Sequence, residues 1–258
     1  MLELKSICVS AGVEDEIEII NNVSLSLDEK KIYVVTGPNG GGKTSLAKAI
    51  MGIYPASGGQ IFLDGEDITD KTVTERACLG IGYAFQAPPR FKGLRVRDIL
   101  TLACWGPKAR PAASCDSDEK LLFSLLADVG LCAQDYIDRQ LDASFSGGEL
   151  KRVEIASILA RSAGELMELR VALFDEPEAG IDLWSFQRLT EAFRQLNQAS
   201  DTTIVIISHQ ERILRLANEV ILICGGKITE IASPDKILGD VDYFAEPGSF
   251  CPNCFARR

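Results

Sequence analysis

Alternation of apolar and polar residues in the first part of the chain predicts a small antiparallel β-sheet. The stretches LELKSICVS (2–10) and EIEIINNVSLSL (16–27) have the short alternating pattern of strands with one buried face. The next run, KIYVVTG (31–37), is almost continuously apolar, which is typical of a strand buried on both faces. The stretch TSLAKAIMGIY (44–54) then has helical spacing. A strand, a glycine-rich loop and a helix therefore follow the antiparallel strands.

The middle of the chain is predicted to be mainly helical. Two more stretches, GGQIFLDGEDIT (58–69) and ACLGIGYAFQ (77–86), have the composition of strands. Three later stretches have apolar residues at helical spacing: VRDILTLACW (96–105), EKLLFSLLADVGL (119–131) and ELKRVEIASILARSAG (149–164). We therefore expect a helical insertion within an α/β chain.

Strands and helices alternate again in the last third of the chain. The strand VALF (171–174) precedes a long helical stretch, LWSFQRLTEAFRQLNQA (183–199). The strand TIVIIS (203–208) precedes a shorter helical stretch, QERILRLA (210–217). The segment EVILICGGKITEIA (219–232) predicts two strands around a glycine pair. This order predicts a core built on a parallel sheet.

Charge and hydropathy narrow the class of protein. The 258 residues include 37 acidic and 27 basic side chains, a formal net charge of −10. This balance argues against nucleic acid as a partner, because proteins that follow a phosphate backbone need clustered lysine and arginine. No apolar run approaches the roughly 20 residues that span a bilayer, and the first ten residues lack the pattern of a secretion signal. We therefore expect a cytoplasmic protein.

The eight cysteines are mostly scattered through predicted strands and helices, which argues against a disulfide framework. Cys251 and Cys254 differ, because they form a C-x-x-C pair that can supply two ligands to zinc or to an iron–sulfur cluster. Two thiols supply only half of the four ligands that such a metal site commonly has. The pair is therefore either an unbound dithiol or part of a site completed by a partner, a second copy or distant cysteines.

The loop GPNGGGKTS matches the phosphate-loop pattern G-x-x-x-x-G-K-[ST], with a predicted strand before it and a helix after it. Glycines allow backbone N–H groups to converge on phosphate oxygens, and the helix N-terminus adds positive potential. Lys43 should reach the β- and γ-phosphates, and the Thr44 hydroxyl should bind Mg²⁺. The expected nucleotide-binding residues are Gly37, Pro38, Asn39, Gly40, Gly41, Gly42, Lys43, Thr44 and Ser45.

Two carboxylates follow the apolar strand in VALFDEP. They should lie at the carboxyl edge of the sheet, where open α/β folds bind ligands. Asp175 suits the Mg²⁺ shell, and Glu176 suits the activation of the attacking water. The sequence thus predicts hydrolysis of a nucleoside triphosphate.

A second glycine-rich stretch, FSGGELKR, also precedes a predicted helix, but it has no phosphate-loop lysine. Its form resembles the [LF]-S-G-G-[QE] signature of the ATP-binding cassette (ABC) ATPases, and the resemblance covers Leu2 to about Ile237. In that family the signature loop closes over the ATP held by a second, head-to-tail subunit. The resemblance therefore implies an ATP-dependent dimer of this chain, with Ser146, Gly147, Gly148 and Glu149 acting across the interface.

The resemblance also implies a fold and a domain plan. The fold is α/β, of the P-loop NTPase class, with a mixed sheet core, an N-terminal antiparallel β-subdomain and an inserted helical subdomain. A single domain (1–258) would comprise an ATP-binding core (1–90 and 166–238), a helical signature subdomain (91–165) and a tail (239–258).

Three further residues match family positions. Gln86 in YAFQ matches the glutamine that senses Mg²⁺ and the attacking water, and Asp182 in AGID matches an aspartate that reaches across the dimer. His209, the only histidine, matches the switch residue that contacts the γ-phosphate. Cassette ATPases commonly stack adenine on an early aromatic side chain. Here the first aromatic residue is Tyr33, and the preceding segment offers only Val9, Ala11 or Val13.

The resemblance leaves two kinds of partner. The stretches AFQAP, FSGGELKR with Glu149, and SHQERIL look like SufC, the ATPase of the SUF iron–sulfur cluster assembly machinery, which docks on SufB/SufD-like scaffold proteins. Most cassette ATPases instead drive a transmembrane permease, which would place the chain at the inner face of a membrane. We expect the SUF-like partner and keep the permease as the alternative.

Overall fold

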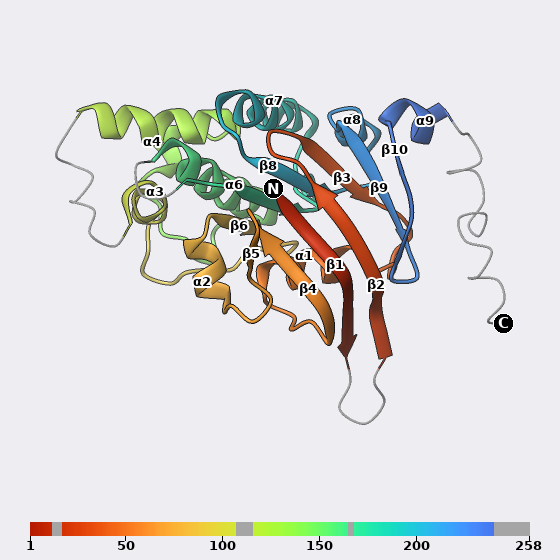
Figure 1. The fold of residues 1–258 in the computed structure, drawn as a ribbon. Coiled ribbons are helices and arrows are strands. Elements are labelled where there is room, and N and C mark those ends of the chain that lie inside the picture. Colours follow the sequence, from red (N-terminus) through yellow and green to blue (C-terminus); the bar gives the residue numbers. More distant parts are fainter. Residues whose placement is uncertain (12–16, 107–115, 165–167, 240–258) are drawn as a thin grey trace.

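Two sheets and the helices that pack on them make up the part of the chain described by the computed structural model, residues 1–11, 17–106, 116–164 and 168–239 (Figure 1). The elements in chain order are β1 (Leu2–Ala11), β2 (Ile17–Leu27), β3 (Ile32–Thr36), α1 (Lys43–Met51), β4 (Gly58–Leu63), β5 (Glu66–Asp67), α2 (Val73–Cys78), β6 (Ile81–Ala84), α3 (Val96–Trp105), α4 (Asp116–Asp128), α5 (Ala133–Tyr136), α6 (Gly147–Ala163), β7 (Val171–Asp175), α7 (Leu183–Ala199), β8 (Thr203–Ile207), α8 (Glu211–Leu214), β9 (Glu219–Cys224), β10 (Lys227–Ala232) and α9 (Pro234–Gly239).

The larger sheet has the strand order β10-β9-β3-β8-β7-β6. Its pairs are parallel except for β9 with β10, which form an antiparallel edge. Strands β3, β7 and β8 are buried along their whole length, which explains their continuous apolar sequences. The mixed sheet core expected from the sequence is therefore present.

The smaller sheet is antiparallel, with the order β2-β1-β4-β5. Apolar side chains from this sheet and from α1 form one core against the larger sheet, and the helices α3 to α7 contribute to a second core on the other side. The two faces of strand β3 contribute to different cores. Val34 packs in the core formed with helices α3 to α7, and Val35 packs in the core formed with the smaller sheet and α1. This alternation follows the two-residue period of a strand.

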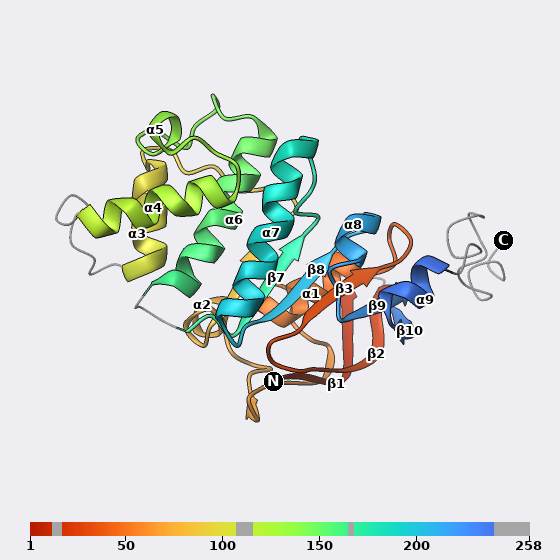
Figure 2. The same cartoon turned by 90° about the horizontal axis from the view of Figure 1, so that it is seen from above.

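Helices α3 to α6 gather at one end of the molecule, and α9 lies at the opposite end (Figure 2). Helix α6 runs from the glycine pair Gly147 and Gly148 back along the larger sheet and packs on α3, α4 and β6. Among the described residues, no helix is long and apolar enough to cross a membrane.

Helix α2 departs from the sequence expectation, which placed Ala77 and Cys78 in a strand. The helix begins after Thr72, whose hydroxyl accepts a hydrogen bond from the N–H of Glu75 while the Glu75 carboxylate accepts one from the N–H of Thr72. This capping box starts a helix that ends at Cys78, and β6 begins only at Ile81.

Arg76 on α2 is buried and forms no direct ion pair with a carboxylate in the described part of the chain. Its guanidinium donates to the carbonyl oxygens of Ala49 and Ile50, at the end of α1, at 2.8 Å each. It also donates to the carbonyls of Thr69 and Lys71, at 2.6 and 3.1 Å. Burial lowers the pKa of Arg76. The side chain therefore caps the end of α1 and joins it to α2.

Replacing Arg76 with methionine should lower the free energy of unfolding by about 2–4 kcal/mol, because several backbone carbonyls lose a buried donor at once. Urea unfolding measures the change. The matched control is Arg215→Met, since that exposed guanidinium only forms an ion pair with Glu211 one helical turn away and should change the stability by less than about 0.5 kcal/mol. Equal effects of the two substitutions would contradict the capping role.

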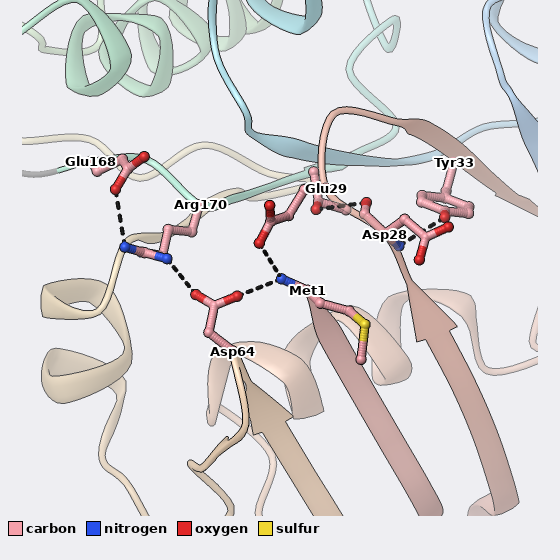
Figure 3. Close-up of polar contacts among 8 residues, drawn as sticks. Met1, Asp28, Glu29, Tyr33, Asp64, Glu168 and Arg170 are labelled. Carbon is pink, nitrogen blue, oxygen red and sulfur yellow. Dashed lines mark hydrogen bonds and ion pairs between the residues drawn. The ribbon is translucent and has the colours of Figure 1, made fainter.

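A polar network joins the two sheets at the amino end of the parallel strands (Figure 3). Arg170, just before β7, donates to Asp64 in the turn between β4 and β5, and also to Glu168 at 3.0 Å. Asp64 also accepts from the Met1 amino group. Burial opposes ionisation, but these two cations hold the pKa of the Asp64 carboxyl below its usual value. The ion pairs are largely exposed, so each stabilises the fold by at most about 1 kcal/mol.

Candidate nucleotide-binding site

The glycine-rich loop between β3 and α1 holds a conformation that excludes side chains at two positions. Gly37 has φ +136°, and a Cβ there would lie 2.1 Å from the carbonyl oxygen of Ile223. Gly42 has φ +105°, and a Cβ there would lie 2.8 Å from the side chain of Ile20. The loop therefore passes close to β9 and β2, and its backbone faces the start of α1.

Lys43 is the first residue of α1 and is nearly buried, with 9% of its surface exposed. Its Nζ donates to the carbonyl oxygens of Gly37 and Pro38, both at 2.9 Å. Burial lowers the pKa of Lys43, whereas the nearby carboxylates Glu176 and Asp175 raise it. The ammonium group is thus held inside the loop by weak acceptors, where a phosphate oxygen is a stronger partner.

Thr44, Asp175 and Tyr83 form a hydrogen-bonded chain below the loop. The Thr44 hydroxyl donates to Oδ1 of Asp175 at 3.1 Å, and the Tyr83 hydroxyl donates to Oδ2 at 3.0 Å. Asp175 is fully buried, and burial raises its pKa while the two hydroxyl groups oppose the rise. Burial and the neighbouring carboxylate also raise the pKa of Tyr83, which therefore remains a donor. A hydroxyl beside a carboxylate is a ligand set that suits Mg²⁺.

The side chains of Glu176 and Gln86 are in direct contact. The Gln86 amide donates to Oε2 of Glu176 at 2.9 Å. Glu176 has φ +46°, a left-handed conformation that costs a non-glycine residue on the order of 1 kcal/mol. Its N–H donates to the carbonyl of Ile207 at the end of β8, which helps to hold that conformation. Glu176 lines the same cavity as the residues of the loop.

One cavity of about 590 Å³ contains most of the expected nucleotide-site residues. Its lining comprises Ile19, Asn39, Gly40, Gly41, Gly42, Lys43, Thr44, Ser45, Gln86, Glu176 and His209. His209 is exposed and follows Ser208, whose hydroxyl donates to Glu178 and accepts from the N–H of Gln210 at 3.0 Å. The segment before Tyr33 offers Val9, Ala11 or Val13 in place of an aromatic residue that stacks on adenine. Val9 is buried in the smaller sheet, and Val13 and the side chain of Ala11 lie outside the described part of the structure. Ile19 is an aliphatic residue that lines the cavity.

The second glycine-rich stretch begins α6 with a capping box. Ser146 Oγ accepts from the N–H of Glu149 at 3.3 Å, and the Glu149 carboxylate accepts from the N–H of Ser146 at 2.7 Å. Two hydrogen bonds, from the Tyr136 hydroxyl and from the Ser146 N–H, lower the pKa of Glu149 to about 2. Glu149 therefore holds the helix end as an anion, a role that the family resemblance did not suggest.

The signature loop lies apart from the cavity at the phosphate loop. In the described part of the chain, the lining of that cavity does not include Ser146, Gly147 or Gly148. Gly147 and Gly148 line a separate groove of about 330 Å³, together with Ala87, Arg90 and Gly180 among others; Gln86 borders both spaces. A Cβ on Gly148 would lie 2.1 Å from the carbonyl oxygen of Gly180. The signature loop therefore packs directly on the turn that leads to Asp182.

Asp182 is exposed and caps helix α7. Its carboxylate accepts from the N–H groups of Trp184 and Ser185 at 3.0 and 2.9 Å, and from the Ser185 hydroxyl at 2.7 Å. These bonds hold its pKa below the usual value. Within this chain, Asp182 therefore stabilises the turn that precedes α7 and the first residues of that helix.

Lys151 and Glu154 were missed by sequence reasoning, as was Tyr83. The buried Lys151 ammonium donates to the carbonyl oxygens of Phe85 and Asp175, the latter at 2.7 Å, and Glu154 accepts from the N–H of Phe85 at 3.0 Å. Burial raises the pKa of Glu154 to about 7. Helix α6 is therefore bonded to the residues that precede Gln86 and Glu176.

Comparisons with known proteins identify the family of this chain. The profile of the family "ABC transporter" matches residues 20–179. The chain is 37% identical to an uncharacterized ABC transporter ATP-binding protein of Methanocaldococcus jannaschii, over 85% of each chain. It is 32% identical to a probable ATP-dependent transporter of Cyanidium caldarium, over 84% of this chain and 85% of that one.

The fold also matches solved structures. A dimeric ATP-binding cassette in a post-hydrolysis state, bound to ADP and Pi, superposes with a TM-score of 0.78 over 91% of this chain and 99% of that one, at 22% sequence identity. The α/β P-loop architecture and the family resemblance expected from the sequence are therefore confirmed. The chain belongs to the ABC transporter family, as an ATP-hydrolysing cassette.

Proposed function

We propose that this chain binds ATP and Mg²⁺ in the cavity at the phosphate loop and that two copies hydrolyse two ATP molecules across a shared interface. The arrangement of the two glycine-rich stretches supports this proposal. The phosphate loop, Gln86, Glu176 and His209 surround one cavity, whereas Gly147 and Gly148 line another groove. A second subunit is the simplest source of a signature loop for this ATP.

Each residue has a chemical task in this proposal. Lys43 and the N–H groups of the loop bind the phosphates, and Thr44, Asp175 and Gln86 hold Mg²⁺, which neutralises the charge that develops on the phosphates. Glu176 accepts a proton from the attacking water, and Gln86 orients that carboxylate. His209 contacts the γ-phosphate, and Asp182 reaches the partner subunit. The division into a core, a helical subdomain and a tail is part of the same proposal.

ATP closure would act on a partner protein through the groove beside Gln86. Arg90 and Ala87 line this groove, and the nearby Phe91 is 42% exposed. Phe85, next to Gln86, donates to Glu154 and accepts from Lys151, and Lys151 also donates to the carbonyl oxygen of Asp175, so these bonds link the groove to the hydrolysis residues. A helix of a partner that docks there could therefore sense the nucleotide state.

Two classes of partner remain. The printed names of both relatives, a transporter ATP-binding protein and an ATP-dependent transporter, support a transmembrane permease, which would make this chain a peripheral subunit at the inner face of a membrane. The motifs AFQAP, FSGGELKR and SHQERIL support a SUF-like, SufB/SufD-type scaffold for iron–sulfur clusters. The names of the relatives favour the permease.

Affinity purification from separated soluble and membrane fractions tests the partner. A multi-spanning protein from the membrane fraction would establish the permease, whereas a cysteine-containing protein that carries iron and sulfide would establish the scaffold. Phe91→Glu should abolish either complex without changing the ATPase rate of the free chain. The matched control, Val73→Glu, alters an equally exposed apolar residue on α2 and should leave the complex intact.

The C-x-x-C pair stays a prediction, because Cys251 and Cys254 lie outside the described residues. We propose that the pair binds a metal in the native assembly. Metal analysis of anaerobically purified protein, with and without residues 251–258, should show bound zinc or iron only when the pair is present.

A further inference from the structure

Tyr83 is a buried side chain that contacts Asp175, which in turn contacts Thr44 in the lining of the cavity at the phosphate loop. It lies on β6, beside β7, and is paired in register with Leu173. The residue is 7% exposed, and its ring packs edge-on against Phe85, with ring centroids 4.7 Å apart. Its hydroxyl donates to Oδ2 of Asp175 at 3.0 Å. Packing alone would require the ring and not the hydroxyl.

The two oxygens of the Asp175 carboxylate have different partners. Oδ1 accepts from Thr44, the residue expected to bind the metal, and Oδ2 accepts from Tyr83. The backbone of Asp175 is also fixed, because its carbonyl oxygen accepts from Lys151 at 2.7 Å. With the backbone held, the orientation of the carboxylate depends on these two hydroxyl groups.

We propose that Tyr83 is a positioning residue for the metal: its hydroxyl holds Oδ2 of Asp175 so that Oδ1 faces Thr44 and the cation. The inference rests on the magnesium site proposed above. A Thr44 oxygen that binds a cation uses a lone pair and keeps its hydroxyl proton for Oδ1 of Asp175. Among the described residues, Tyr83 is the side-chain donor to Oδ2, the other oxygen of this buried carboxylate. It stabilises the charge of a ligand without contacting the metal itself.

The test is Tyr83→Phe, which removes the hydroxyl and keeps the ring. Mn²⁺ replaces Mg²⁺ as a paramagnetic probe, and electron paramagnetic resonance measures its binding to the full chain in complex with ADP. The substitution should weaken Mn²⁺ binding roughly ten-fold, as losses of hydrogen bonds to metal ligands commonly do. Binding of ADP in the presence of EDTA should not change.

A matched control is Tyr33→Phe. Tyr33 is also buried in the larger sheet, and its hydroxyl accepts from the N–H of Asp28 at 2.9 Å, in the network at the amino end of the strands (Figure 3). This control should leave Mn²⁺ binding unchanged. In an Asp175→Asn background, Tyr83→Phe should have no further effect on Mn²⁺ affinity, because the hydroxyl acts through that carboxylate.

Equal Mn²⁺ affinity in the wild-type and Tyr83→Phe proteins would overturn the role of Tyr83 and leave the magnesium site standing. Equal loss of ADP affinity with and without metal would overturn it too, since this would show general damage to the site. Absence of ADP-dependent Mn²⁺ binding by the wild-type chain would overturn both the inference and the magnesium site on which it rests.

Discussion

Glu176→Gln should lower the turnover of ATP hydrolysis by about 10²- to 10⁴-fold, the usual contribution of a general base. Glutamine preserves the shape of the side chain, and its amide oxygen can still accept the hydrogen bond that Gln86 now donates to Glu176 at 2.9 Å. What the substitution removes is the negative charge that takes the proton from water. Steady-state ATPase assays measure the turnover, and equilibrium titration measures the affinity for ATP.

The affinity for ATP should remain within about two-fold of the wild-type value, because loss of an interaction made only in the transition state lowers kcat without weakening substrate binding. Glu211→Gln is a suitable control, since Glu211 is an exposed glutamate two residues after His209 and pairs with Arg215. It should hydrolyse ATP at the normal rate. Unchanged turnover in Glu176→Gln would show that another group activates the water.

Much of the sheet could be predicted because its strands are buried on both faces. Burial along the whole of β3, β7 and β8 requires continuous apolar sequences, which stand out against alternating and helical patterns. Short elements were predicted less well. Helix α8 ends at Leu214, before the end of the predicted helical stretch, because the chain turns into β9 through a hydrogen bond from the N–H of Asn218 to Ile32.

The residues of the candidate site also fall into two groups, those that the sequence predicts and those that only the structure reveals. Residues of the phosphate loop are contiguous, so a local motif is enough to find them. Tyr83, Lys151 and Glu154 act through contacts between residues 24 to 92 positions apart. Helical spacing marks Lys151 and Glu154 only as parts of α6, and nothing local indicates that they face Phe85. The one signal in the sequence was the position of Tyr83, three residues before Gln86 on a strand that neighbours Asp175.

The monomer offers a direct way to test the two-subunit site at Gly147. This glycine is exposed, and a Cβ built on it has no neighbour within 4 Å, so a larger side chain fits without strain. Gly148 differs, because a Cβ there would meet the carbonyl oxygen of Gly180 at 2.1 Å. A substitution at Gly147 therefore reports on what approaches the signature loop from outside, whereas one at Gly148 would disturb the chain itself.

Gly147→Glu should abolish ATP-dependent dimerisation while the monomer still binds ATP with its normal affinity. The new carboxylate would stand where the γ-phosphate held by the partner subunit approaches, and repulsion between anions should weaken the dimer at least 100-fold. Analytical ultracentrifugation of the hydrolysis-deficient Glu176→Gln protein, with and without ATP, measures the effect. Gly239→Glu is the matched control: this glycine also has open space around it but lies at the end of α9, at the other end of the molecule from α6 (Figure 2), and its dimer should form normally. A Gly147→Glu protein that still dimerises with ATP would mean that the signature loop does not close over the nucleotide of a second subunit, and the loop would then need a different anion as its ligand.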